Sequence, residues 1–384
     1  MKDRLHICII SELFPTETAP VFTFVEQLVC AMADQEVECT VIAPQSITKA
    51  LFRKETLTEV KSIRKTDNGN DYFVYRPYSL SFSNLIAGSE SINVKFSRFS
   101  VERTLLHNNI KPDVFYCHFW HSAAFVIAYA RRHDIPLFVA SGESKINICN
   151  LCSDKTIDSI SSFVTGVICV SSKNKRESMM LKLAPEDRMI VLPNAVDSRK
   201  FYKVDKNSAR ERLGFDNTDF IVIFVGGFNH RKGPDRVAEA IKFLNNKKIK
   251  SIFVGSGDTE INCSGILFKG QLSHSELVNY LNCADVFVLP TLHEGCCNAI
   301  IEAMACGLPV ISSDRDFNDD ILLPEYSIRT DPESIEDIAS AISFLYNHPA
   351  ERREMADKAL KAAKNFGIGE RAGKIISFIR SRLH

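Results

Sequence analysis

The chain alternates short apolar runs with longer segments in which apolar residues recur every three or four positions. In the first half, one helix is predicted over residues 23–33, where Phe24, Leu28 and Met32 fall at helical spacing. Strands are predicted over residues 5–10, 37–42, 114–116, 137–140 and 167–170. Further helices are predicted over residues 123–132 and just after residue 170, where the segment is polar. This alternation indicates a parallel sheet with crossover helices.

The alternation starts again after a charged segment, residues 198–217, for which we expect irregular structure. The strands predicted in this second set cover residues 220–225, 251–254, 286–289 and 309–312. A last helix is predicted within residues 371–383, because Ile375, Ile376 and Ile379 share one helical face. Residues 48–100 show no clear period, and no element is predicted there.

The two sets of elements predict an α/β protein with two Rossmann-like, doubly wound domains that face each other across a cleft. We expect an N-terminal domain over residues 1–195, a C-terminal domain over residues 196–365, and a helix over residues 366–384 that packs back on the N-terminal domain. Doubly wound sheets bind ligands at the carboxyl ends of their strands. The fold therefore favours an enzyme that acts on a nucleotide or a sugar nucleotide.

Composition narrows the class of protein. The 384 residues contain 47 Lys+Arg and 47 Asp+Glu, so the net charge is zero and the basic excess of most nucleic-acid binders is absent. Most of the 12 cysteines lie in apolar runs, which is typical of free thiols in a reducing compartment. No signal peptide and no apolar stretch of membrane-spanning length is visible. We therefore expect a cytoplasmic protein.

The densest chemical signal lies between the strand at 286–289 and the strand at 309–312. A loop after Pro290 carries Glu294, and a helix is expected to start near Asn298 and Ala299 and to carry Glu302 one turn in. The free N–H groups of a helix start suit a diphosphate. Two carboxylates beside such a site can each accept hydrogen bonds from hydroxyl groups, one set on a sugar and the other on a ribose.

A second signal follows the strand at 220–225. Gly226 and Gly227 allow a close approach of the backbone to a ligand. Arg231 and Lys232 come next, and both side chains can bind phosphate. The alternative is an ordinary solvated basic turn.

These segments resemble those of glycosyltransferase family 4, the glycosyl transferases group 1, which has the fold called GT-B. Glu294 and Glu302 match the two glutamates of that family's Glu-x7-Glu segment, and Lys232 with Gly233 matches its Lys-Gly motif. The stretch 254–258, which includes Gly255, is similar to the loop that flanks the nucleotide base. Similar stretches extend from about residue 4 to residue 340.

The resemblance implies roles for these residues. Glu294 would contact hydroxyls of the donor sugar, Glu302 the ribose, and Lys232 the diphosphate. Gly227 stands where the family has an arginine, so Arg231 is a candidate substitute. His118 ends a strand as in the family and would bind a donor-sugar hydroxyl, the alternative being a packed histidine. Glu143 is a candidate acceptor-side group or, equally, a capping residue.

The sequence also departs from the family. The N-terminal loop over residues 19–26 lacks the usual glycines, which puts close contact between its backbone and the donor phosphate in doubt. Residues 314–320 replace the family's Gly-Gly turn, so contacts to the sugar or acceptor are expected to differ there.

The implied activity is transfer of a sugar from a nucleotide diphosphate sugar to an acceptor hydroxyl, with retained anomeric configuration, in bacterial surface polysaccharide assembly. The C-terminal domain would bind the donor and the N-terminal domain a saccharide or lipid-linked saccharide acceptor. No cofactor and no metal are expected. The basic helix around Lys173 and the aromatic stretch at Phe82 are candidates for peripheral membrane contact at the inner face, with a solvated helix face as the alternative.

Two rival hypotheses stay open. One is a nucleotide-sugar epimerase or hydrolase, which would turn over the donor without an acceptor. The other is a non-catalytic nucleotide-sugar-binding scaffold of the same fold.

Overall fold

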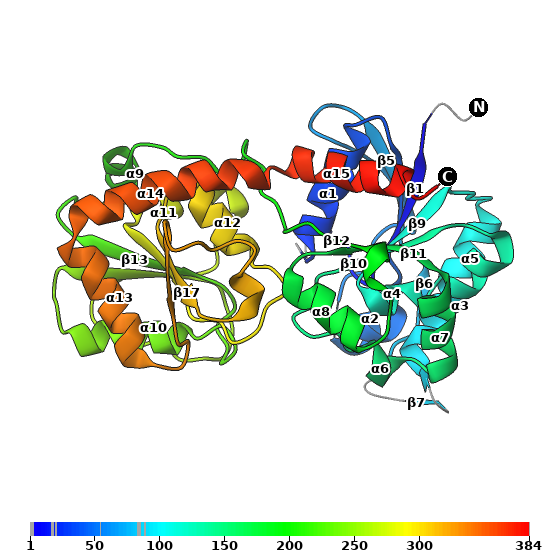
Figure 1. Cartoon of the computed structure of the whole chain (residues 1–384), viewed down its shortest axis with the longest axis horizontal. Helices are drawn as coiled ribbons and strands as arrows, with labels where there is room; N and C mark the ends of the chain where they lie inside the picture. The colour runs from blue at the N-terminus through cyan, green and yellow to red at the C-terminus, as the bar shows by residue number, and fades with distance from the viewer. Residues whose placement is uncertain are drawn as a thin grey trace. The chain divides into compact units, whose positions relative to one another are not determined.

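The computed structural model describes residues 4–16, 19, 21–53, 55–82, 86–87 and 90–383. The chain forms two compact units (Figure 1). Unit 1 consists of Met1–Leu192 and Gly369–His384, and unit 2 consists of Pro193–Ile368. The chain thus returns to unit 1 for its last helix. Part of the N-terminal loop, at residues 17, 18 and 20, lies outside the described residues.

Unit 1 is built on an eight-stranded sheet with the order β12-β11-β10-β9-β1-β2-β5-β4. Neighbouring strands are parallel except β4, which pairs antiparallel with β5 at the edge. The strands are β1 (His6–Ile10), β2 (Glu38–Ile42), β4 (Lys61–Lys65), β5 (Asp71–Tyr75), β9 (Val114–His118), β10 (Leu137–Ser141), β11 (Val164–Cys169) and β12 (Met189–Val191). Two further sheets have two strands each. One pairs β3 (Gln45–Ser46) with β6 (Tyr78–Ser79), and the other pairs β7 (Ile86–Ala87) with β8 (Glu90–Ser91).

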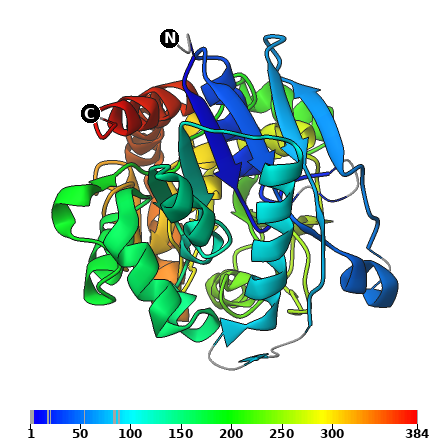
Figure 2. The same cartoon turned by 90° about the vertical axis from the view of Figure 1, so that its right-hand side faces the viewer.

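Helices cover both faces of this sheet. They are α1 (Thr23–Ala33), α2 (Ile47–Arg53), α3 (Ile92–His107), α4 (Trp120–Ala123), α5 (Ile127–His133), α6 (Ile148–Leu151), α7 (Asp154–Phe163), α8 (Ser172–Met180) and α15 (Ile368–Arg380). The start of α15 meets the end of α1, where Gln35 Nε2 donates to the carbonyl of Gly369, whereas α3 lies well apart from α15 (Figures 1 and 2). Cys8 and Ile10 of β1 belong to the core that packs on α3, α5 and α7. Because both faces are buried, the strands read as continuous apolar runs.

Unit 2 has a six-stranded, fully parallel sheet with the order β15-β14-β13-β16-β17-β18. The strands are β13 (Phe220–Val225), β14 (Ile249–Val254), β15 (Ile266–Gly270), β16 (Val286–Leu289), β17 (Val310–Ser313) and β18 (Ser327–Thr330). The helices are α9 (Lys206–Leu213), α10 (Pro234–Leu244), α11 (His274–Cys283), α12 (Asn298–Ala305), α13 (Ile335–Asn347) and α14 (Pro349–Ala363). α10 packs with α13, α11 with α9, and α12 with α14.

Three expectations from the sequence need correction. The helix expected over residues 123–132 is split into α4 and α5, because the amides of Ala124, Phe125 and Val126 bond three residues back and not four. Residues 198–217 were expected to be irregular, but they contain α9, which Asp205 caps by accepting from the N–H of Ser208. Residues 48–100, for which no element is predicted, contain most of α2, the strands β4 to β8 and the first half of α3.

All twelve cysteines are free thiols in the structure. Among the described helices, none is both long and apolar enough to cross a lipid bilayer.

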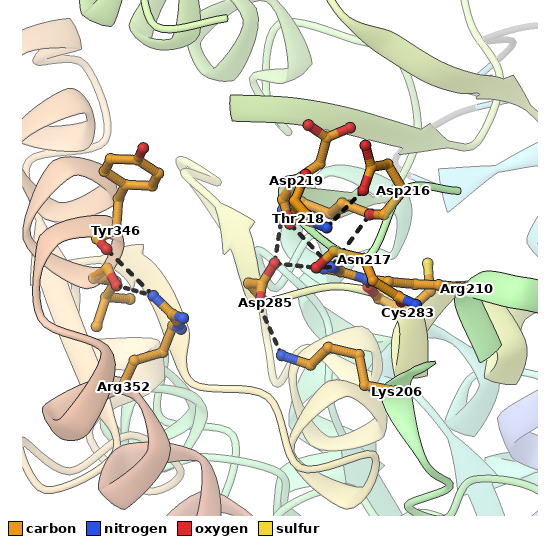
Figure 3. Close-up of polar contacts among 12 residues, drawn as sticks. Lys206, Arg210, Asp216, Asn217, Thr218, Asp219, Cys283, Asp285, Tyr346 and Arg352 are labelled. Carbon is orange, nitrogen blue, oxygen red and sulfur yellow. Dashed lines mark hydrogen bonds and ion pairs between the residues drawn. The ribbon is translucent and has the colours of Figure 1, made fainter. Parts of the chain in front are cut away.

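A buried ion pair holds the amino ends of the central strands of unit 2 together (Figure 3). Arg210 of α9 donates to Asp285 Oδ2 at 2.6 Å, and the same oxygen accepts the N–H of Ile221 at 2.8 Å. Lys206 donates to the other oxygen of Asp285 at 2.7 Å. Burial alone would raise the pKa of Asp285, but the two cations outweigh burial and hold the pKa below its ordinary value. Arg210 also donates to the carbonyls of Cys283, Asn217 and Asp219.

We expect Arg210→Ala to destabilise unit 2 by about 3–5 kcal/mol, because it removes the buried cation that pairs with Asp285 and leaves three backbone carbonyls without their donor. Urea denaturation followed by circular dichroism measures this loss. Lys242→Ala, which removes an exposed pair with Glu239, serves as the control and should change the free energy of unfolding by less than about 0.5 kcal/mol. A loss below about 1 kcal/mol for Arg210→Ala would show that the ion pair is not needed for stability.

Candidate functional site

Three neighbouring loops of unit 2 start at the same edge of the sheet. β13 lies between β14 and β16 and is parallel to both, so the carboxyl ends of the three strands share this edge. The loops that follow carry residues 226–233, 255–258 and 290–297, and the last loop leads into α12. All the site residues predicted from the sequence except His118 and Glu143 lie on these loops or on α12.

The glycines after β13 and β14 let two loop backbones touch. Gly255 has a φ of +148°, and a Cβ placed there would lie 1.9 Å from the carbonyl oxygen of Gly226. A Cβ on Gly227 would meet the amide of Asn229 at 2.8 Å. Gly255 is therefore required by the contact between the loops, a role distinct from the base contact expected from the sequence.

Lys232, Arg231 and Glu294 come together in the structure. Lys232 Nζ and Arg231 Nη1 each lie 2.6 Å from Glu294 Oε1, and Thr291 Oγ1 donates to the same oxygen at 2.9 Å. Arg231 Nη1 also donates to the carbonyl of His293 at 2.6 Å. Two cations thus share one carboxylate, so these three side chains together carry one positive charge. They lie at the edge of the sheet where the three loops start, which we call the loop edge.

The environment of Lys232 keeps it charged. Its side chain is only 14% exposed. Burial alone would lower the pKa of Lys232, but the pKa is raised, because the carboxylate of Glu294 is paired with the ammonium group; the sulfur of Cys297 also lies close to it. Cys297 is the residue that precedes α12, so the ammonium group lies beside the helix start.

A thiol occupies the start of α12. No side-chain hydrogen bond caps this helix, and the N–H groups of Ala299 and Ile300 face the sulfur of Cys297. Burial raises the pKa of Cys297, so the sulfur is a neutral thiol and a weak acceptor. Asn298 Oδ1 is buried without a hydrogen-bond partner among the described residues. The helix start therefore offers donors that a stronger acceptor, such as a phosphate oxygen, could engage.

Glu302 lies one turn beyond Asn298 on the same face of α12. Burial raises the pKa of this carboxyl to about 7. Within the described part of the chain its side chain has no hydrogen bond or ion pair. About half of the Glu302 carboxyl groups are therefore ionised near pH 7. An ionised carboxylate without partners can accept hydrogen bonds from a ligand.

Arg236 was not recognised from the sequence. It donates from α10 to the carbonyl of His230 at 2.9 Å and to that of Pro290 at 2.8 Å, so it joins the loop of Lys232 to the loop of Glu294. A Cβ on Gly233 would collide with its guanidinium group. No motif signals this role, because it depends on two loops that only the folded sheet brings together.

His118 lies in unit 1, at the end of β9, and the structure does not place it with the residues of unit 2. Its ring packs against Phe24 and Phe119, with centroids 5.3 and 4.7 Å away. Burial, with Arg371 and His121 nearby, lowers the pKa of His118 to about 3, so the ring is neutral at physiological pH. Nδ1 is buried without a partner among the described residues. Nδ1 of a neutral imidazole can donate or accept one hydrogen bond with a ligand, but the ring has no extra proton to give as a general acid.

Glu143 acts as a cap in unit 1. Its carboxylate accepts the N–H of Trp120 at 2.7 Å and that of Gly142 at 3.0 Å. Of the two alternatives for this residue, the structure favours capping.

Over the described residues, no group of three or more His, Cys, Asp or Glu could hold a metal ion.

Comparison with known proteins connects this geometry to a family. Residues 205–362 match the model of the family described as "Glycosyl transferases group 1". TuaC of Bacillus subtilis (strain 168), a glycosyltransferase named for teichuronic acid biosynthesis, is 26% identical over 339 residues, which cover 86% of this chain and 84% of TuaC. The Escherichia coli UDP-Gal:alpha-D-GlcNAc-diphosphoundecaprenol alpha-1,3-galactosyltransferase is 31% identical over 178 residues, 42% of this chain and 46% of that enzyme.

Solved structures show the same fold over nearly the whole chain. Sucrose-phosphate synthase from Thermosynechococcus elongatus superimposes with a TM-score of 0.76 at 17% identity and covers 98% of this chain and 99% of its own. HepE of Anabaena, solved with UDP and glucose, has a TM-score of 0.70 at 14% identity and covers 98% of this chain and 100% of its own. Residues 205–362 are thus similar to the glycosyl transferases group 1 family, and nearly the whole chain has the GT-B fold of these solved structures.

Proposed function

We propose that the chain transfers a sugar from a uridine diphosphate sugar to a hydroxyl of a saccharide or lipid-linked saccharide, with retention of configuration, in the assembly of a bacterial polysaccharide. The observation that carries the proposal is the convergence of Lys232 and Arg231 on Glu294 beside the start of α12. This arrangement supplies positive charge and free backbone donors where a leaving diphosphate would need them.

The ion pairs around Glu294 suggest how the donor would bind. A diphosphate carries more negative charge than one carboxylate, so it would draw Lys232 and Arg231 toward itself. Glu294, which is held by Thr291 as well, would then be released to accept hydrogen bonds from the donor sugar. Glu302 would accept hydrogen bonds from the ribose, which would give its carboxylate the partners it lacks.

The relatives support the choice of substrates. The Escherichia coli relative is named for transfer from UDP-Gal to a diphosphoundecaprenol-linked sugar, and TuaC for teichuronic acid biosynthesis. HepE was solved with UDP and glucose. These names favour a uridine diphosphate donor and an acceptor on the way to a surface polysaccharide.

The proposed chemistry needs no base from the protein. In front-face attack the leaving phosphate accepts the proton of the acceptor hydroxyl, the bond from the anomeric carbon to the phosphate oxygen breaks, and the new glycosidic bond forms on the same face. Lys232 and Arg231 would stabilise the charge on the departing diphosphate. Neutral His118 would then act only by hydrogen bonding to the donor sugar.

Peripheral membrane contact through α8 receives little support. Lys173 pairs with Glu177 at 2.8 Å and Lys175 with Glu186 at 2.9 Å, so these two lysines are already engaged.

We expect Lys232→Ala to raise the dissociation constant of UDP-glucose by about 10–100-fold, because a charge-assisted bond to the diphosphate is lost. Lys232→Arg should recover part of the affinity. Lys247→Ala, which removes an exposed lysine of the same unit, is the control and should bind as the wild type does. Isothermal titration calorimetry measures the four dissociation constants, and equal binding by Lys232→Ala and wild type would refute the phosphate role.

Donor turnover separates the proposal from its rivals. UDP release from UDP-sugars should be slow alone and should rise at least about tenfold with a competent saccharide acceptor, and the anomeric proton of the product should show retention by NMR. Release at the same rate without any acceptor would instead indicate a hydrolase. Donor binding without turnover across the acceptor panel would indicate a scaffold.

The affinity for UDP-glucose should depend on the protonation of Glu302. Since its pKa is about 7 and the ionised form accepts the hydrogen bonds, affinity should increase about tenfold between pH 6 and pH 8. UDP-glucose suits this test because its diphosphate does not titrate in this range. Glu302→Gln should bind more weakly at pH 8 and show a flat profile. A wild-type profile as flat as that of Glu302→Gln would contradict the role of Glu302.

A further inference from the structure

A cavity of about 500 Å³ lies within unit 2, at the edge of the sheet opposite the loop edge. Its walls include residues 284–285 before β16 and residues 307–309 before β17, together with residues 203–206 around the start of α9 and the first two turns of α14. β16 and β17 are parallel neighbours, so their amino ends meet at this edge. The volume suits a small molecule.

Positive side chains outnumber carboxylates around this cavity. The cations in its wall are Lys203, Lys206, Arg352 and Arg353, and the carboxylates are Asp205 and Asp285. Two partners stand beside the wall: Arg210 pairs with Asp285, and Asp357 pairs with Lys203. When the wall and these partners are counted together, five cations meet three carboxylates, so the excess is two positive charges.

Three of these cations act on a single carboxylate. Asp285 accepts from Lys206 at 2.7 Å with one oxygen and from Arg210 at 2.6 Å with the other. Asp285 also attracts Arg352, although burial has the larger effect and lowers the pKa of Arg352. Figure 3 shows Arg352 and Lys206 reaching toward Asp285 from different helices, α14 and α9. Both oxygens of Asp285 are engaged, and Arg352 forms no ion pair with any described carboxylate.

Arg352 is held in place and keeps N–H groups available. Its Nη1 donates to the carbonyl of Leu345 at 2.5 Å, and its guanidinium group lies 5.1 Å from the ring centre of Phe220. Nε and Nη2 donate to no group in the described part of the chain, which leaves their N–H groups for a ligand. A guanidinium group that presents such donors suits the oxygens of a phosphate.

Two exposed cations complete the wall. Arg353 donates from Nε to the carbonyl of Pro349 at 3.2 Å and pairs with no carboxylate among the described residues. Lys203 lies against the backbone of Gly307, where φ is +75° and a Cβ would come within 3.1 Å of Lys203 Cδ. The ammonium group of Lys203 pairs with the exposed Asp357 at 3.2 Å. A pair this exposed contributes little, so Lys203 can exchange Asp357 for a ligand.

The remaining carboxylates nearby are directed elsewhere. Asp205 faces its own helix, where it accepts the N–H and the hydroxyl of Ser208 at 2.8 and 2.9 Å. Glu351 and Glu354 of α14 do not line the cavity, and Glu354 pairs with Lys358 at 2.6 Å. None of these carboxylates therefore forms an ion pair with the two arginines of the wall.

We propose that this cavity binds the phosphate group of a small ligand, either inorganic phosphate or a phosphate ester, with Arg352 and Arg353 holding the phosphate oxygens and Lys203 and Lys206 beside them. A phosphate group carries about −1.5 to −2 charges near pH 7, which matches the excess of two positive charges, whereas a carboxylate carries one. This site lies at the edge of the sheet opposite the proposed donor site and does not depend on it.

Methyl NMR of the full chain with carbon-13-labelled alanine methyl groups tests this site. Ala284 and Ala356 line the cavity, and Ala299 at the start of α12 reports on the loop edge. Inorganic phosphate should shift the signals of Ala284 and Ala356 in a saturable way. Acetate should need an at least about tenfold higher concentration, because it carries only one charge. Absence of saturable shifts at both methyl groups, or an equal response to acetate, would overturn the proposal.

Ribose 5-phosphate separates the two sources of the phosphate group. The same shifts with this probe would show that the cavity accepts a phosphate ester. A response to inorganic phosphate alone would identify the free ion as the ligand.

Variants locate the phosphate. Arg353→Gln and Lys203→Gln should each reduce the phosphate affinity about fivefold, because each removes one exposed charge from the wall. Arg212→Gln on α9 and Lys358→Gln on α14 remove exposed cations that do not line the cavity, and these matched controls should bind as the wild type does. Unchanged affinity in both cavity variants would contradict the assignment.

This proposal and the donor site can fail separately. UDP-glucose should shift the signal of Ala299, and this effect should be weakened in Lys232→Ala. Phosphate should shift Ala284 and Ala356 equally in Lys232→Ala and in the wild type. Phosphate shifts confined to Ala299 would place the anion at the loop edge and reject the cavity, whereas a failure of UDP-glucose to shift Ala299 would count against the donor site alone.

Discussion

The buried ion pair between Arg210 and Asp285 sets the geometry on which the proposed donor site depends. Asp285 stands one residue before β16, and its carboxylate binds the N–H of Ile221 in β13 as well as Arg210. This contact lies next to the pairing of Val222 with Val286, so it favours one register between the two strands. In a parallel sheet the register at the amino ends also decides what meets at the carboxyl ends. The distances between Lys232, Arg231 and Glu294 therefore depend on an interaction at the opposite edge of the sheet.

At the loop edge of unit 2, several polar and charged groups lack the partners that would compensate for their removal from water. Two cations share Glu294, the carboxylate of Glu302 has no partner in the described chain, and the start of α12 has only a neutral thiol beside it. Arg236 nevertheless holds both loops by their carbonyls, so the loop backbones are in place before any ligand arrives, although the side chains around Glu294 can still move. A preorganised site of this kind stabilises charge without reorganising during the reaction, which is the main electrostatic advantage of an enzyme over water. The same unpaired groups make the unliganded unit less stable than a fully paired one would be.

The sequence predicted best the elements whose burial is uniform. β13, β16 and the start of α12 lie where the apolar runs and the loop residues placed them, because buried parallel strands leave a simple pattern. α9 was missed because six of its eight residues are polar or charged, including Arg210, which is only 2% exposed and serves the ion pair. The break between α4 and α5 could not be seen in a segment that is apolar on every side. The identities of Glu294, Lys232 and Glu302 were available from motifs, but the shared oxygen of Glu294 and the role of Arg236 depend on loops from different strands.

The parts of the chain that were hardest to interpret line a cavity of unit 1. Residues 44–46, 55–58 and 76–81 contribute to it, and they belong to short strands and connections without a hydrophobic period. Such segments contribute little to the core, so their side chains can change with little loss of stability, whereas the residues that form β13 or β16 cannot. The loop edge of unit 2 differs in this respect, because Asp285 ties β13 to β16 at one end of the sheet and Arg236 ties their loops together at the other. A substitution among those residues would disturb the strands as well as the loops, whereas a substitution in the cavity wall of unit 1 would change the cavity and leave the sheet intact.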